Sequence, residues 1–198
     1  MTKRELTRQK IIEQSAKLFN KQGFAGTSIQ DIMNVTGLKK GGIYGNFQNK
    51  EEIAVEAFEY SVRLVTKEVK KLADKEFNTI DKLRIVIEFY RNYLNNPPII
   101  GGCPILNTSI EADDTNPVLK QRVINALNNW KGSLMGTILK GQARNEIKQN
   151  TNPAQFSTIF IAMLEGGILL SKAYSDTSHL NIVLDRLEKM IDEELIIE

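Results

Sequence analysis

Apolar residues recur along this chain at intervals of three and four positions, which is the period of an amphipathic helix. Ile12, Ala16 and Phe19, for example, mark one side of a helix that Gly23 would end. No stretch alternates apolar and polar residues over the length of a strand with hairpin turns between. The pattern therefore predicts an all-α protein with about nine helices.

Capping residues predict where the helices of the N-terminal part begin. Ser28 is followed three positions later by Asp31, so that hydroxyl and carboxylate can each accept a free N–H group at a helix start. Thr2 and Glu5 repeat this arrangement for the first helix. A short third helix is expected over about residues 39–46, and Asn49 is expected to cap a long fourth one.

The rest of the chain uses a second start signal, an asparagine before a proline. Asn116-Pro117 and Asn152-Pro153 each place a capping side chain before a proline at the first helical position. The helices expected in this part cover about residues 79–95, a short segment after Pro104, about 117–148, about 153–174, and a last one from about 178.

Charge is distributed unevenly between the two ends of the chain. Residues 1–50 contain nine basic and three acidic residues, a balance of +6, whereas the whole chain has a net charge of +2. The remaining 148 residues therefore carry −4. A small basic head on a larger acidic body is typical of a nucleic-acid-binding module joined to a second domain, although a lysine-rich solvated surface is the alternative. We expect the domains to divide near residue 50, into 1–50 and 51–198.

The composition disfavours several classes of protein. One cysteine cannot form an internal disulfide, and together with a single histidine it cannot form a Cys/His zinc cluster. No bilayer-spanning segment is expected, and "MTKRELTRQK" lacks the apolar core of a secretory signal. No nucleophile–base–acid set and no glycine-rich phosphate loop is visible, so we predict no catalytic residues, no metal and no cofactor. A cytoplasmic protein that is not an enzyme is expected.

The stretch "GLKKGGIYGNF" contains two adjacent glycines where a helix is expected. Each glycine inside a helix costs about 1 kcal/mol relative to alanine. Two short helices joined by Thr36-Gly37-Leu38 make a helix-turn-helix, in which the second helix enters the DNA major groove. Positions without side chains would let the helix backbone approach bases and phosphates. We therefore expect Gly41 and Gly42 to lie on the DNA face.

Polar and basic side chains around the glycines complete the predicted DNA-binding surface. Lysine and tyrosine at such positions contact phosphates and set the register of a protein on the duplex. A solvated charge is the alternative for each lysine. The predicted DNA-binding residues are Thr27, Ser28, Gln30, Lys39, Lys40, Gly41, Gly42, Tyr44, Asn46 and Lys50.

The segment "GFAGTSIQDIMNVTGLKKGGIYGNFQNKEEI" resembles the DNA-binding domain of TetR-family transcriptional repressors. Their pattern has a glycine-aromatic pair, a Thr/Ser cap, a Gly-hydrophobic turn, and then Lys-Gly-x-hydrophobic-Tyr-x-x-Phe-x-x-Lys-Glu. The matching residues are Gly23, Phe24, Thr27, Ser28, Asp31, Ile32, Gly37, Lys40, Gly41, Tyr44, Phe47, Lys50 and Glu51. Three positions depart from this pattern. Lys39 stands where the family often has serine, Gly42 where it usually has threonine or serine, and Gly45 where it often has histidine. With glycine at 42 and 45, fewer side chains reach the groove.

The resemblance implies a homodimer that binds a pseudo-palindromic operator, is released by a small effector, and dimerises through its last two long helices. Three alternatives remain open, and the first is an activator of the same fold in place of a repressor. The trigger is either such an effector or an oxidant or electrophile that reacts with Cys103. A helix-turn-helix protein with a solid body that acts through a protein partner is the alternative function.

A second stretch, "IIGGCPILNTSIEA", has Gly-Cys-x-x-x-Asn followed by a glutamate. It resembles a branch of the family with Gly-Cys before the sixth helix, in which some members sense electrophiles or oxidants and others bind aromatic compounds. Cys103 stands at a helix start, where the helix dipole favours the thiolate. The alternative is a small buried residue that fills a tight helix start.

Two further sets of residues are predicted in the body. Aromatic side chains are candidates to line a pocket for an apolar or aromatic effector, although plain core is the alternative for each of them. The effector set is Phe89, Tyr93, Cys103, Asn107, Trp130, Phe160 and Met163. Small residues inside a helix permit the close approach of a second helix, with a local kink as the alternative. The dimer set is Phe156, Gly166, Gly167, Leu170, Leu184, Leu187 and Ile191.

Overall fold

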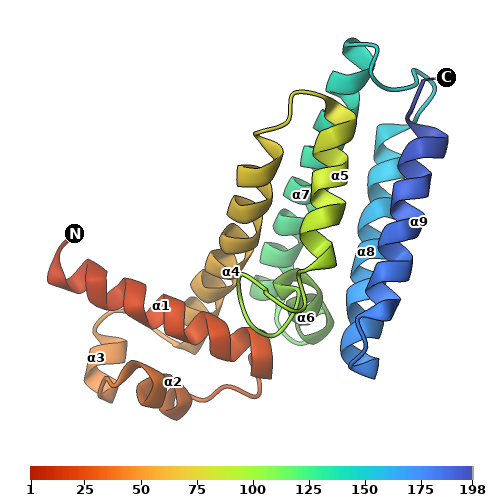
Figure 1. The fold of residues 1–198 in the computed structure, drawn as a ribbon. Helices are drawn as coiled ribbons and strands as arrows, with labels where there is room; N and C mark the ends of the chain where they lie inside the picture. Colours follow the sequence, from red (N-terminus) through yellow and green to blue (C-terminus); the bar gives the residue numbers. More distant parts are fainter. Residues whose placement is uncertain (198) are drawn as a thin grey trace. The chain divides into compact units, whose positions relative to one another are not determined.

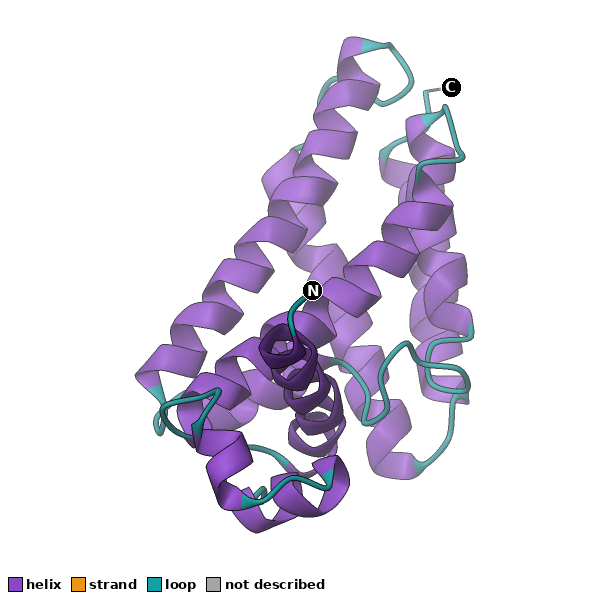
Figure 2. Ribbon diagram, turned by 90° about the vertical axis from the view of Figure 1, so that its left-hand side faces the viewer, coloured by secondary structure: helices purple, strands orange, loops and turns teal. Residues whose placement is uncertain are grey.

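The computed structural model describes residues 1–197, and within them it contains nine helices and no strand. Figure 1 and Figure 2 show the arrangement of the helices within the chain. The all-α prediction is confirmed. The helices are α1 (Lys3–Gln22), α2 (Ile29–Thr36), α3 (Lys40–Tyr44), α4 (Lys50–Ala73), α5 (Thr79–Arg91), α6 (Pro104–Ala112), α7 (Pro117–Ala143), α8 (Pro153–Tyr174) and α9 (Ser178–Glu194).

The predicted capping residues stand at the helix starts. The hydroxyls of Thr2 and Ser28 accept the backbone N–H groups of Glu5 and Asp31, whose carboxylates accept the N–H groups of the two cap residues. The hydrogen bonds from the Ser28 hydroxyl and backbone lower the pKa of Asp31. Asn49 caps α4 through its side-chain oxygen, as predicted. These contacts join residues three apart, so a local sequence pattern suffices to predict them.

Two helices end earlier than their periodicity predicts. α7 ends at Ala143 because Asn145 takes a left-handed conformation with φ 55°, and the N–H of Glu146 bonds back to the carbonyl of Gly141 at 2.8 Å. A left-handed residue just past the last turn is a common way for a helix to end. α5 ends at Arg91 instead of continuing to 95.

The chain divides into two compact units, and α6 belongs to the unit that contains the first three helices. The first unit comprises residues 1–65 and 99–126, and the second comprises 66–98 and the chain from 127 onward. The division of function near residue 50 stays a prediction, because compactness does not show which residues perform which task.

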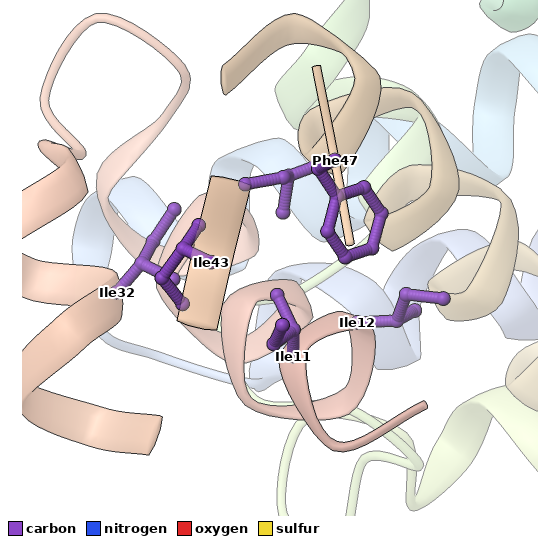
Figure 3. Packing of buried hydrophobic residues seen from close by; sticks show 6 residues of the cluster. Ile11, Ile12, Ile32, Ile43 and Phe47 are labelled. Atoms are coloured by element: carbon purple, nitrogen blue, oxygen red, sulfur yellow. The ribbon is translucent and has the colours of Figure 1, made fainter. Parts of the chain in front are cut away.

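The core of the first unit holds α3 against α1 and α2. Figure 3 shows its apolar side chains converging from several helices; the buried members are Ile11, Ile12, Ile32, Ile43, Phe47 and Ile53. Leu38 packs against them from the turn before α3. Burying each such side chain contributes about 1.5–3 kcal/mol. Leu38, Ile43 and Phe47 thus hold the helix on its inner side, as predicted.

In the second unit, α8 packs along α9, and α5 also contacts α9. Gly167 explains how closely α8 and α9 approach, since a Cβ atom there would lie 3.1 Å from side-chain atoms of Leu180 and Val183. Figure 1 shows these two helices side by side. The α9 residues buried in this packing are Leu180, Leu184, Leu187, Met190 and Ile191.

By length and composition alone, α8 is apolar enough to cross a membrane. The expectation that no such segment exists is therefore wrong by this criterion. A core helix of a soluble protein passes the same test, and the side of α8 that includes Phe160, Leu164 and Ile168 is fully buried within the chain. Its contacts with α9 account for the apolar character of that side.

Candidate DNA-binding site

The turn between α2 and α3 has the geometry of a helix-turn-helix. Gly37 follows α2 in the left-handed conformation, with φ 69°, and its N–H bonds to the carbonyl of Met33. Glycine has no Cβ to oppose this conformation, so the helix can stop there. Lys39 then precedes α3 in an extended conformation and makes no side-chain capping bond, in keeping with its departure from the usual serine.

One face of α3 is exposed while the other is buried. Ile43 is fully buried in the core, whereas Lys39, Lys40, Gly41 and Tyr44 are exposed. The ammonium group of Lys40 lies 5.9 Å from the centre of the Tyr44 ring. The exposed face therefore offers two cationic groups and a phenol beside a stretch of bare backbone.

Within residues 1–197, no contact requires glycine at positions 41 and 42. A Cβ atom at Gly41 would meet no atom within 4 Å, and one at Gly42 would make ordinary contacts of 3.5 Å or more with Leu38. Neither residue has a positive φ. Gly45 differs, because its Cβ would lie 3.0 Å from the carbonyl oxygen of Gly41. The structure thus gives no internal reason for the two adjacent glycines.

The remaining predicted DNA-binding residues differ in their exposure. Ser28 and Gln30 are exposed at the start of α2, where Ser28 bonds to Asp31 and the amide of Gln30 donates to the side-chain oxygen of Asn34 at 2.9 Å. Thr27 is fully buried, and its hydroxyl donates to the carbonyl of Gly23 at 2.7 Å. The amide of Asn46 donates to the carbonyl of Gly42 at 2.9 Å. The side chain of Thr27 thus bonds to the end of α1, and that of Asn46 bonds to α3.

Lys50 is directed toward the loop between α1 and α2. Its ammonium group donates to the carbonyls of Phe24 and Thr27, at 2.8 and 3.0 Å, and lies 4.0 Å from the centre of the Phe24 ring. The sequence pattern suggested a phosphate contact for this lysine. In the structure two of its three donors are used inside the chain.

Two arginines of α1 were not predicted as part of the site. Arg8 lies 4.0 Å above the Phe47 ring, donates to the Asn46 carbonyl, and pairs with the carboxylates of Glu52 and Glu56. The pKa of Glu52 is lowered, mainly by the backbone N–H of Gln48 and also by Arg8.

Arg4 lies in the first turn of α1 and lines a surface hollow together with Arg8, Tyr44 and Gln48. It is exposed, so it adds a positive charge beside the exposed face of α3. No local pattern marks Arg8, because its partners Asn46, Glu52 and Glu56 are distant in the sequence.

Three of the predicted effector residues lie in one aromatic cluster of the second unit. Phe89 and Tyr93 have ring centres 5.7 Å apart, and Trp130 stacks on the neighbouring Tyr90 at 6.3 Å. Tyr93 is buried and Trp130 half-buried. Phe160 is fully buried and stacks on Phe156 at 6.2 Å.

The other effector candidates lie elsewhere. Met163 is partly buried on α8, while Cys103 and Asn107 belong to the first unit. Cys103 is buried at the start of α6 and makes no side-chain capping bond. The amide of Asn107 donates to the carbonyls of Asn20 and Gly101, both at 2.9 Å.

Most of the predicted dimer residues are covered by their own chain. The buried ones are Phe156, Gly167, Leu184, Leu187 and Ile191. Their apolar spacing reflects packing within the second unit, which sequence periodicity cannot distinguish from packing against a second chain. Gly166 and Leu170 retain accessible surface. They belong to a small and apolar stripe on α8 in which Gly166 is half-buried and the other members are exposed: Ile159, Ala162, Leu169, Leu170 and Ala173.

Within residues 1–197, no group of three or more His, Cys, Asp or Glu side chains could hold a metal ion. The geometry in hand is therefore that of a small helix-turn-helix with a basic, partly bare recognition face. A face of this kind is suited to contact with the DNA backbone.

Two family models match consecutive parts of the chain. The model of bacterial regulatory proteins of the tetR family matches residues 11–57, which include the helix-turn-helix. The model of the tetracyclin repressor-like C-terminal domain matches residues 79–187. The second match alone covers more than half of the chain.

Solved structures and curated relatives agree with these matches. A TetR transcriptional regulator from Chloroflexus aurantiacus J-10-FL superposes with a TM-score of 0.95 at 36% identity, over 100% of both chains. A TetR-family regulator from Cytophaga hutchinsonii superposes with a TM-score of 0.95 at 35% identity, over 100% of this chain and 99% of that one. The regulator YxaF of Bacillus subtilis is 25% identical over 96% of this chain and 98% of its own. This protein therefore belongs to the TetR family of bacterial transcriptional regulators.

Proposed function

We propose that this protein is a homodimeric repressor that binds a pseudo-palindromic operator and leaves it when a small effector binds the body. The observation that carries the proposal is the exposed face of α3, where Gly41 and Gly42 have no internal reason to be glycine. A helix whose backbone must approach bases and phosphates closely supplies such a reason. Lys39, Lys40 and Tyr44 beside them suit phosphate contacts.

The exposed stripe on α8 supports dimerisation. Isolated exposed apolar residues are ordinary, but a continuous apolar surface marks an interaction site. Leu169 and Leu170 are 46% and 44% exposed, and Gly166 beside them has open space in place of a side chain. A second copy of α8 fits there at short distance. Dimerisation also brings two recognition helices to half-sites about 34 Å apart, one turn of DNA.

The aromatic cluster around Tyr90 supports an apolar or aromatic effector. Its rings come from α5, the following turn and α7, so a ligand inserted among them would contact several elements at once. A regulator of the same fold from Saccharomonospora viridis is known in complex with choline, at 18% identity. An effector shifts the equilibrium between operator-bound and free protein only by its difference in affinity for the two states.

The proposal is tested by selecting bound sequences from a random duplex pool with the purified protein. We expect a two-fold symmetric sequence whose affinity falls steeply with salt. The same duplex then serves to screen aromatic compounds and thiol-reactive reagents, the latter addressing the alternative trigger at Cys103. No enrichment by protein refolded without ligand would overturn operator binding. Unchanged affinity at saturating concentration of a ligand shown to bind would overturn release.

A further inference from the structure

Two oppositely charged side chains hold the loop between α1 and α2, residues 23–28. Lys50, the first residue of α4, donates to the carbonyl of Phe24 at 2.8 Å and to that of Thr27 at 3.0 Å. Glu111 of α6 accepts the N–H of Phe24 at 2.6 Å and that of Ala25 at 2.7 Å. The two backbone polar groups of Phe24 are thus bonded to charges of opposite sign that come from different helices.

The packing around Phe24 and Gly23 shows that this loop is shaped for both contacts. The Phe24 ring lies under the Lys50 ammonium at 4.0 Å and stacks on Phe19 at 6.3 Å. Gly23 has φ 78°, and a Cβ atom there would lie 2.7 Å from a carboxylate oxygen of Glu111. Only glycine therefore admits the carboxylate at this distance without strain.

A second contact anchors the same face of α6 to the end of α1. Asn107 precedes Glu111 by four residues, so both side chains lie on one side of the helix. Its amide donates to the carbonyl of Asn20, and the amide of Asn20 donates to the carbonyls of Ile100 and Gly102 at 2.8 and 3.0 Å. The residues of the pattern Gly-Gly-Cys-x-x-x-Asn-x-x-x-Glu thus attach α6 to α1 and to the loop that follows α1.

We propose that Glu111 and Lys50 are positioning residues for operator binding. They fix residues 23–28, the loop ends in Ser28, which caps α2, and α2 leads through a short turn into α3. A displacement of α6 would therefore reach the recognition helix through Glu111. This inference rests on the proposed function. It also gives Lys50 an internal role in place of a phosphate contact.

The sign of the effect separates positioning from simple electrostatics. Neutralising Glu111 removes a negative charge, which by itself strengthens attraction to the DNA polyanion. Positioning predicts the opposite, a loss of affinity. Asp113 is a matched control, because it lies just beyond α6 and is also a carboxylate, yet it pairs with Lys120 at 2.8 Å and not with the loop.

The experiment compares full-length Glu111→Gln, Asp113→Asn, Lys50→Met and Lys50→Arg with the wild type. Operator affinity is measured against salt, and hydrogen exchange of the Phe24 and Ala25 amides is measured without DNA. We expect Glu111→Gln to speed both exchanges and to lower affinity about tenfold, the ratio for one lost charge-assisted hydrogen bond. Asp113→Asn should do neither. Lys50→Met should lower affinity at an unchanged salt slope, and Lys50→Arg should restore it.

Each contrary outcome overturns a named part of the inference. Unchanged hydrogen exchange at Phe24 and Ala25 in Glu111→Gln would show that Glu111 does not hold these amides. Equal operator affinities of Glu111→Gln and Asp113→Asn would refute the positioning role of Glu111. A salt slope reduced by about 0.9 in Lys50→Met would make that lysine a phosphate contact. A wild-type protein that binds no duplex would overturn the proposed function itself, whereas an effect missing only in the variants leaves that function intact.

Discussion

Replacing Gly41 by alanine should change stability and operator affinity in opposite directions. The added methyl group meets no atom within 4 Å, and the backbone has no positive φ to oppose it. The substitution therefore removes only the entropic disadvantage of glycine, and the free energy of unfolding should rise by about 0.4–1 kcal/mol.

On DNA the same methyl group would stand between the recognition helix and the duplex. Inserting one into a closely packed contact costs about 1–3 kcal/mol. That corresponds to a rise of about 5- to 150-fold in the operator Kd for each recognition helix, since 1.4 kcal/mol is tenfold. Urea unfolding measures the first effect, and titration of the selected operator measures the second.

Gly132 of α7 provides a matched control. It is exposed, lies in a helix interior, and has no atom within 4 Å of the position of a Cβ atom. Gly132→Ala should raise stability by a similar amount and leave operator affinity unchanged. If Gly41→Ala bound the operator as tightly as the wild type, close approach of the α3 backbone to DNA would be refuted.

Three further changes test other parts of the structure. Ile43→Ala should lower the free energy of unfolding by about 2–5 kcal/mol, because it empties a fully buried site in the core under α3; a smaller loss in urea unfolding would contradict that packing. Leu170→Glu should shift the protein toward monomer in sedimentation at unchanged helix content, and a persistent dimer would place the interface elsewhere. Ser28 hydrogen bonds lower the pKa of Asp31, so their stabilisation is present above the unfolded pKa of about 3.9 and is lost as pH falls through the lower folded value. Ser28→Ala should therefore lose less stability than the wild type between about pH 4 and pH 2, and parallel curves would contradict the coupling.

The sequence predicted best those features that depend on neighbours within one turn. The caps at Ser28 and Asn49 and the inward direction of Ile43 follow from local spacing, and the structure has them. Family resemblance in residues 23–51 supplied the rest of the head. The early end of α7 depends on the left-handed conformation of Asn145, and no capping pattern in the sequence predicted that conformation.

Side-chain partners that are distant in the sequence could not be predicted from it. Periodicity indicates that Leu184 and Ile191 are covered but not by which helix, and in the structure α9 packs against α8 and α5 of the same chain. A lysine at the start of α4 looks like any basic residue near DNA, yet Lys50 turns to the carbonyls of the α1–α2 loop. Glu111 did have a signal, its spacing of four from Asn107, but only the structure shows what that helix face touches.

The glycines at the junction of α1 and α6 have a consequence for genetics. Gly23 and Gly101 both have positive φ, and a Cβ atom at Gly101 would lie 2.5 Å from the carbonyl oxygen of Asn20. A larger residue at Gly101 would clash with the backbone at the end of α1, and one at Gly23 would displace the Glu111 carboxylate from its contacts with the loop. For the proposed repressor, a selection for constitutive expression of the regulated genes should therefore recover substitutions of Gly23 and Gly101, although both residues lie outside the recognition helix.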